Sequence, residues 1–370
     1  MSNTDLPLSQ AFNPKKNSLD FLRLFFAFLV IFSHSYPLGG FRYESIFGEP
    51  NIYGEIAVSS FFIISGFLIT RSYQNTQSIV RFIWSRSLRV FPGLWVCLIV
   101  TILLFAPILH YEKYRTLSNY FQLYQAGPLQ YLKANFLIEM KQYDINGLTL
   151  GLPFPSAFNG SLWTLVYELK CYLGIAFLGW TKILDRQKIL VPILFFLFFQ
   201  IYMVDLVSPG TAAKILPYFT DIYNYKLPMF FLAGAVLHLY NVHIIISKKI
   251  LISFAVMIVL SVSQQSNLYH LISPFALSYA VIALAIYLPF SRIGKYGDFS
   301  YGVYIYAFPV QQLLSFFKLN QYGFTTYVML SMLLTSFLSI LSWFLVEKPS
   351  LAMKKFSLLK AISSKKSLGL

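Results

Sequence analysis

Ten stretches of this chain are apolar and long enough to cross a lipid bilayer as helices, and they dominate residues 19–346. A helix needs about 20 mostly apolar residues to span the hydrocarbon core. Only 12% of the residues are charged, against about 25% in soluble domains. The sequence therefore predicts an all-α, polytopic membrane protein built as a bundle of about ten transmembrane helices. The predicted spans are residues 19–38, 56–73, 91–109, 161–180, 189–206, 226–246, 250–264, 271–290, 299–316 and 323–346.

The distribution of lysine and arginine predicts the orientation of these spans. With the N-terminus inside, the inner segments hold 20 of the 29 Lys and Arg residues, and an excess of such residues is typical of cytoplasmic loops. We therefore expect a cytoplasmic N-terminal segment (1–18), a transmembrane domain (19–346) and a cytoplasmic tail (347–370). Residues 110–160 then form a long outer loop, which is either an ordinary connector or a surface for a polar partner such as a sugar.

The composition also excludes several classes of protein. The net charge of +15 comes from basic loops between apolar spans, so we expect contact with membrane lipid and none with nucleic acid. Both cysteines, Cys97 and Cys171, fall inside apolar segments and suggest neither a disulfide framework nor a metal site. No Gly-rich phosphate loop, HExxH or paired CxxC occurs, so a soluble metalloenzyme or nucleotide-binding fold has no support.

The first span carries two ionisable residues, Arg23 and His34, in the stretch SLDFLRLFFAFLVIFSHSYPL. Eleven steps of about 100° bring them to one face of a helix, roughly 16 Å apart along its axis. Histidine exchanges protons near neutral pH. Taken singly, Arg23 could reach lipid phosphates or pair with Asp20, and His34 could be a structural residue of the bundle. Their shared face favours a functional role for both.

A second polar face occurs in NGSLWTLVYELKCYL, where Ser161, Thr164 and Glu168 recur at helical spacing. A carboxylate within a span costs about 2.5–3.5 kcal/mol on insertion scales, so it usually has a partner or a task. Counted from the outer helix ends, Glu168 and His34 lie at similar depths, so a contact between them is feasible. The alternative is a structural ion pair with another span, since Lys170 points to the opposite side.

A third cluster, RFIWSRSLRVFP, places Arg81, Arg86 and Arg89 at the inner end of the third span. The forked guanidinium matches phosphate oxygens. On charge alone, however, an anchor at the inner surface is the simpler interpretation. In the second span, Ser65 and Gly66 permit close packing of helices.

In their order along the chain, these motifs resemble the acyltransferase 3 family of bacterial membrane O-acyltransferases. The resemblance covers nearly the whole chain, and we expect the stand-alone type without an attached esterase-like domain. The motifs that carry it are LDFLR with His34 following Arg23, FFIISGFLIT, RSLRVFP, GSLWTLVYE, SYGVYIYAFPV and EKP. Two positions depart from the family pattern: Ala307 stands where many members have histidine, and Glu168-Leu169-Lys170 replaces Glu-Glu-Gln.

The resemblance implies transfer of an acyl group, most often acetyl, from cytoplasmic acyl-CoA to a hydroxyl of a surface polysaccharide at the bacterial inner membrane. His34 and Glu168 are then the expected catalytic residues, with His34 acting as general base or, less simply, as a covalent acyl carrier. The expected acyl-CoA ligands are Arg23, Arg86 and Arg89. Ser161 and Trp163 are the expected acceptor-binding residues. No metal is expected, and polysaccharide-assembly proteins are possible partners.

Two alternatives remain from the sequence. Charges on one face of a membrane helix also serve transporters, here of a glycan precursor or an organic acid. Paired broken helices would favour that interpretation, and the sequence has none. The second alternative is a structural role in a polysaccharide-assembly complex.

Overall fold

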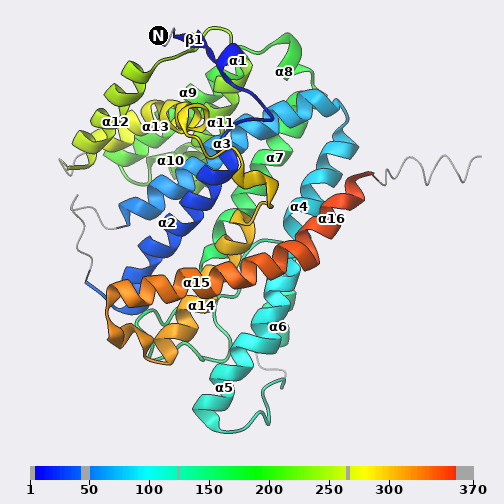
Figure 1. Ribbon diagram of the computed structural model, residues 1–370, viewed down its shortest axis with the longest axis vertical. Coiled ribbons are helices and arrows are strands. Elements are labelled where there is room, and N and C mark those ends of the chain that lie inside the picture. Colours follow the sequence, from blue (N-terminus) through cyan, green and yellow to red (C-terminus); the bar gives the residue numbers. More distant parts are fainter. Residues whose placement is uncertain (1–4, 43–50, 123–125, 264–266, 356–370) are drawn as a thin grey trace, which may run out of the picture.

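The computed structural model describes residues 5–42, 51–122, 126–263 and 267–355, and within these ranges nearly all regular structure is helical. Figure 1 shows long helices packed side by side in one bundle, which confirms the predicted all-α fold. The long helices are α2 (Leu19–Gly39), α3 (Ile52–Thr76), α4 (Ile79–Val100), α7 (Leu165–Trp180), α9 (Leu190–Val207), α11 (Tyr223–Leu239), α12 (Lys248–Ser263), α13 (Leu268–Tyr287), α14 (Ser300–Phe316) and α15 (Phe324–Ser342). The shorter ones are α1 (Leu8–Ala11), α5 (Ala106–Tyr114), α6 (Pro128–Asn135), α8 (Ile183–Arg186), α10 (Thr211–Ile215) and α16 (Lys348–Ala352).

Each of the ten predicted spans coincides with one long helix. In the part of the chain that the structure describes, seven helical stretches are long and apolar enough to cross a membrane. Three further helices, α11, α12 and α14, occupy predicted spans with 17, 16 and 17 residues. The protein is therefore a polytopic membrane bundle.

Loops gather alternately at the two ends of the bundle. At one end, strand β1 (Leu6–Pro7) pairs antiparallel with β2 (Ile245–Ile246), and the Ser18 hydroxyl donates to the Leu288 carbonyl at 2.7 Å. At the other end, the Asn320 amide donates to the Gly39 carbonyl at 2.9 Å. The alternation agrees with the predicted path of the chain. Which end faces the cytoplasm stays a prediction from charge.

The third span is longer than predicted at both ends, and most of the extension precedes its predicted start at residue 91. Helix α4, a π-helical turn (Thr101–Phe105) and α5 form one helical stretch, Ile79–Tyr114, of 36 residues. At 1.5 Å per residue it measures about 54 Å, more than the roughly 30 Å hydrocarbon core. In Figure 1, α5 and α6 accordingly extend beyond the rest of the bundle. The arginines predicted to precede the span lie within α4 itself.

The last span also runs beyond its predicted end at residue 346. A π-helical turn, Trp343–Glu347, joins α15 to α16, and a further short helix covers Met353–Lys355. Single π-turns often occur at functional sites because they change the direction of a side chain. Here the turn leaves Glu347 only 2% exposed. The rest of the predicted tail, 356–370, lies outside the described residues.

Small residues allow the closest helix crossing. A Cβ added to Gly66 of α3 would lie 1.8 Å from the Phe231 carbonyl oxygen of α11, and one added to Gly234 would lie 2.0 Å from that of Ile63. Only glycine permits such an approach between two membrane helices. The expectation of close packing at Ser65–Gly66 is confirmed.

Candidate active site

Two cavities are both lined by residues of α2, α14 and the 3₁₀ turn η2 (Ser161–Thr164) that precedes α7. The arginine cavity has a volume of about 140 Å³, and its polar lining consists of Arg23, Ser65, Arg86, Arg89, Thr164, Glu168, Tyr172, Ser300, Tyr301 and Tyr304. The histidine cavity has a volume of about 760 Å³, and its lining includes Ser33, His34, Asn51, Tyr143, Trp163 and Phe308.

Helix α2 connects the two cavities. Arg23 lines the arginine cavity and His34 lines the histidine cavity. Their separation of eleven residues corresponds to about 16 Å of helix, so each reaches a different cavity from the same inward face. The predicted shared face of Arg23 and His34 therefore points into the bundle rather than toward lipid.

The arginine cavity contains an ion-pair network that joins three helices. The Asp298 carboxylate, just before α14, lies 2.6 Å from the Arg23 guanidinium and 2.5 Å from that of Arg89. Arg89 also lies 3.5 Å from Glu347, the residue turned inward by the π-helical segment. Burial alone would raise the pKa of Asp298, but the two arginines outweigh it and lower this pKa to about 2. Asp298 is thus ionised throughout the physiological range.

Asp20, which the sequence suggested as a partner of Arg23, is the weaker of the two carboxylate partners of this arginine. Its carboxylate lies 3.8 Å from the guanidinium and is 47% exposed. An exposed pair of this kind stabilises little. Asp298 is the principal partner, and nothing local in the sequence links residues 23 and 298.

Arg86 differs from its two neighbours. Its Nε donates to the Ser85 hydroxyl at 3.2 Å, and within the described ranges no carboxylate lies at ion-pair distance. The guanidinium lines the arginine cavity together with Arg23 and Arg89. Among the described residues its remaining N–H donors have no partner, so they can bind an anion that enters the cavity.

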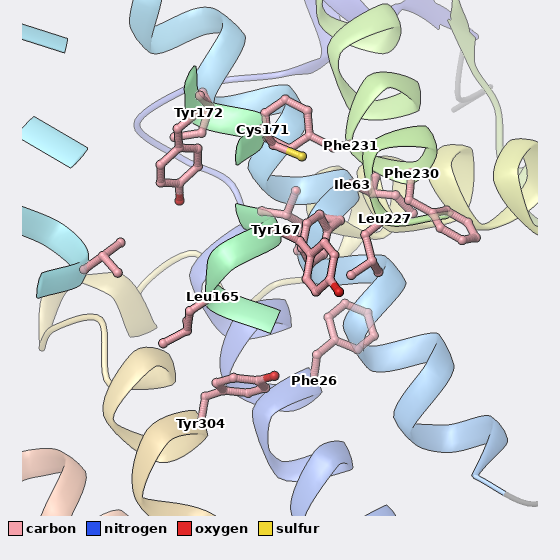
Figure 2. Packing of buried hydrophobic residues seen from close by; sticks show 14 of the residues in the cluster. Phe26, Ile63, Leu165, Tyr167, Cys171, Tyr172, Leu227, Phe230, Phe231 and Tyr304 are labelled. Carbon is pink, nitrogen blue, oxygen red and sulfur yellow. The ribbon is translucent and has the colours of Figure 1, made fainter. Parts of the chain in front are cut away.

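Glu168 lies in the arginine cavity, not beside His34. Its Oε1 accepts hydrogen bonds from the Tyr172 hydroxyl, one turn later, and from the Ser65 hydroxyl at 3.4 Å. Figure 2 shows Tyr172 on α7 projecting from the ribbon beyond Leu165. The structure thus does not form the expected contact between Glu168 and His34, which face different cavities.

The local backbone explains this correction. Ser161–Thr164 forms a 3₁₀ turn before α7 begins. Over its four residues such a turn rises about 2 Å more than an α-helix, and its tighter winding also changes the direction in which Glu168 projects. Ser161 is fully buried, its Oγ has no hydrogen-bond partner among the described residues, and it lines neither cavity, so its role in acceptor binding stays a prediction.

His34 is arranged so that its ring faces the histidine cavity. Its buried Nδ1 has no hydrogen-bond partner in the described part of the chain, and its ring packs edge-on against Phe308, with centroids 5.4 Å apart. Nearby, the Ser33 hydroxyl donates to the Asn51 side chain at 2.7 Å. The cavity thus places a proton-accepting ring beside hydroxyl, amide and aromatic groups.

Trp163 lies at the same cavity, as expected for a residue that contacts an acceptor. Its ring lies 4.2 Å from that of Tyr223 and 5.7 Å from that of Tyr167, measured between centroids. Tyr143 from the long outer loop lines the cavity too. The aromatic faces make a surface on which a sugar ring can stack.

Sequence reasoning missed Asp298 and Glu347 as members of the site. Asp298 lies two residues before the motif SYGVYIYAFPV, and Glu347 begins EKP. A carboxylate at the edge of an apolar span was the available signal, because such a group usually has a partner.

Comparison with known proteins identifies the chain's relatives. The family model described as "Acyltransferase domain" (acyltransferase 3) matches residues 16–346. The chain is 31% identical to an O-acetyl transferase of Shigella phage Sf6 over 339 residues, covering 90% of this chain and 96% of that protein. It is 26% identical to nodulation protein 10 of Rhizobium leguminosarum bv. viciae over 372 residues, with 94% and 96% covered. No solved structure matches.

Proposed function

The chain belongs to the acyltransferase 3 family, and from that premise we propose that it moves an acetyl group from cytoplasmic acetyl-CoA to a hydroxyl of an exported polysaccharide. It is an O-acetyltransferase by its family and by its identity to the phage enzyme. Membership of an enzyme family argues against the transporter and structural roles that the sequence left open. We place it in the bacterial inner membrane, where a cytoplasmic donor can meet an exported glycan.

The arginine cavity is the proposed donor site. The single observation that carries this proposal is the unpaired Arg86 guanidinium beside Arg23 and Arg89, because forked donors suit phosphate oxygens. A volume of about 140 Å³ is small beside the roughly 300–1,000 Å³ of typical ligand pockets. The cavity therefore fits the acyl-thioester end of the donor, while the arginines bind phosphates at its mouth.

The histidine cavity is the proposed acceptor site. Its volume of about 760 Å³ lies within the range of pockets that bind whole small ligands. Trp163 and Tyr143 offer aromatic faces, and Ser33 and Asn51 offer hydrogen bonds. This mixture suits a sugar residue of a glycan, and it supports an acceptor that enters from the outer end.

In the proposed reaction, His34 acts as general base on the acceptor hydroxyl. The ring nitrogen that faces the cavity takes the hydroxyl proton as the oxygen attacks the thioester carbonyl carbon. The new C–O ester bond forms, the C–S bond breaks, and the proton passes to the leaving thiolate to give free CoA. Direct transfer requires the two substrates to meet beside His34. A covalent acyl-histidine remains the less direct variant.

Glu168 has a donor-side role in this proposal. Its carboxylate holds the Tyr172 hydroxyl and lines the same cavity as Arg86. It acts on the donor through Tyr172 and the charge of the cavity, and not through the His34 ring. It is therefore a positioning residue.

The test uses the purified protein in lipid nanodiscs with radiolabelled acetyl-CoA and polysaccharide from a strain lacking the gene. We expect label in the polysaccharide and free CoA in equal amounts. Mass spectrometry of polysaccharide from the deletion strain separates the alternatives in cells. Loss of one acetyl mass per repeat supports the enzyme, whereas loss of the whole polymer would support transport or assembly.

A further inference from the structure

A thin layer of side chains separates the arginine cavity from the histidine cavity. The boundary crosses η2 (Ser161–Thr164) between neighbouring residues, because Trp163 lines the histidine cavity and Thr164 the arginine cavity. On α14 it falls within one turn, because Tyr304 lines the arginine cavity and Phe308 the histidine cavity. The layer is therefore about one helical turn thick.

A hydrogen bond closes the arginine-cavity side of this layer. The hydroxyls of Thr164 and Tyr304 lie 2.6 Å apart, and the two residues are 5% and 8% exposed. The Phe61 ring packs edge-on against that of Tyr304, with centroids 5.9 Å apart. Figure 2 shows the Tyr304 side chain below those of Leu165 and Phe26. The ring is held in place on more than one side.

Phe308 closes the other side. Its ring packs against His34 and, with centroids 5.6 Å apart, against Phe154. A Cβ added to Gly160 would lie 2.6 Å from the Phe308 ring, so the backbone before η2 lies directly against it. An acyl group that approaches His34 from the arginine cavity meets first Tyr304 and then Phe308.

We propose that Tyr304 and Phe308 form an acyl-size filter, which restricts the transferred group to acetyl. This inference rests on the proposed function, since it assumes that the donor occupies the arginine cavity and the acceptor the histidine cavity. For direct transfer, the carbonyl carbon must come within about 3–3.5 Å of the acceptor oxygen. An acetyl group extends only one methyl beyond that carbon. A longer acyl chain needs more room between the rings of Tyr304 and Phe308, both of which are buried.

The magnitude of the selectivity follows from general experience with packed pockets. One methylene too many or too few changes discrimination by about 10–200-fold. Two extra methylenes, as in butyryl, should therefore reduce transfer at least about 100-fold relative to acetyl. The hydroxyl of Tyr304 positions the ring, and the ring itself excludes the chain. Substitutions that remove only the hydroxyl or the whole ring distinguish these two effects.

The experiment measures transfer of acetyl, propionyl and butyryl groups from their CoA thioesters to polysaccharide from the deletion strain. In Tyr304→Ala and Phe308→Ala, we expect the butyryl-to-acetyl ratio to rise at least tenfold over wild type. Tyr304→Phe keeps the ring, so its ratio stays within about twofold even if its rate falls. Phe199→Ala, which removes a buried ring on α9 away from both cavities, is the matched control and keeps the wild-type ratio.

Each outcome decides the question. Equal use of acetyl and butyryl by wild type, or an unchanged ratio in both alanine variants, would overturn the filter while leaving the enzyme assignment intact. No transfer by wild type from any acyl-CoA would instead overturn the proposed donor, and the filter with it. If an alanine variant does not fold, Tyr304→Leu and Phe308→Leu remove less volume, and the same rise in ratio is required of them.

Discussion

The Asp298 carboxylate lies 2.5 Å from the Arg89 guanidinium and so connects the start of α14 to α4. The same oxygen lies 2.6 Å from Arg23 of α2, and the carboxylate is 18% exposed. One largely buried anion thus pairs with two arginines from different helices. Removing one partner of such a network leaves the others uncompensated.

We predict that Asp298→Asn lowers the stability of the folded protein by about 3 kcal/mol, near the lower end of the range for broken buried pairs. The measurement is the apparent Tm in detergent with and without the substitution. Asp20→Asn is the control, because that carboxylate is 3.8 Å from Arg23 and 47% exposed. We expect Asp20→Asn to lower the free energy of unfolding by less than about 1 kcal/mol. Equal effects of the two substitutions would contradict the network.

The pH dependence of this effect has a definite sign. The pKa of Asp298 is lowered to about 2 in the folded protein, below the roughly 3.9 of an unfolded chain. Its contribution is complete above the unfolded value and is lost as pH falls through the folded one. The difference between wild type and Asp298→Asn should stay constant from pH 6 to 8 and shrink below about pH 4.

The sequence predicted the helices well because apolar length is a local property. It also predicted that Arg23 and His34 share one face, since both lie on one uninterrupted helix. It failed where geometry is not local. Asp298 meets Arg23 across more than 270 positions of sequence, and the 3₁₀ turn before α7 changes the depth and direction at which Glu168 projects. Periodicity assumes a regular helix and cannot anticipate such a turn.

Arg86 provides the sharpest test of donor binding. Arg86→Ala should raise the KM for acetyl-CoA by about 10- to 100-fold, since a hydrogen bond to a charged group contributes about 1.5–3 kcal/mol. Stability should change little, because no described carboxylate depends on this guanidinium. Arg81→Ala on the same helix is the matched control, because Arg81 is exposed and lines neither cavity. If Arg86→Ala leaves the KM for acetyl-CoA unchanged, Arg86 does not bind the donor and serves only as an anchor at the membrane surface.

His34→Ala should lower kcat by about 10²- to 10⁴-fold, the usual contribution of a general base. The protein should still insert and accumulate, and its KM for acetyl-CoA should stay near the wild-type value because His34 lies outside the arginine cavity. His243→Ala removes an exposed histidine and should leave kcat unchanged. Retained acetylation in His34→Ala would exclude the proposed base.

Gly66→Ala should destabilise the bundle by about 1–3 kcal/mol, because the new methyl would meet the Phe231 carbonyl oxygen at 1.8 Å and push α3 from α11. Gly174→Ala on α7 is the matched control, since nothing lies within 4 Å of the added methyl. Alanine favours the helix there by up to about 1 kcal/mol. Apparent Tm values in one detergent compare the two, and a similar fall in both would contradict the close crossing.

Glu168→Gln distinguishes the contact expected from sequence from the one in the structure. Because the Glu168 carboxylate binds Tyr172 and Ser65 in the arginine cavity, the substitution should raise the KM for acetyl-CoA. It should leave the midpoint of the acidic limb of the kcat/KM pH profile unchanged, because His34 faces the other cavity. Tyr172→Phe removes the donor of that hydrogen bond and should reproduce the KM effect. A shift of the midpoint by a full pH unit or more in Glu168→Gln would mean that the carboxylate reaches His34 during turnover.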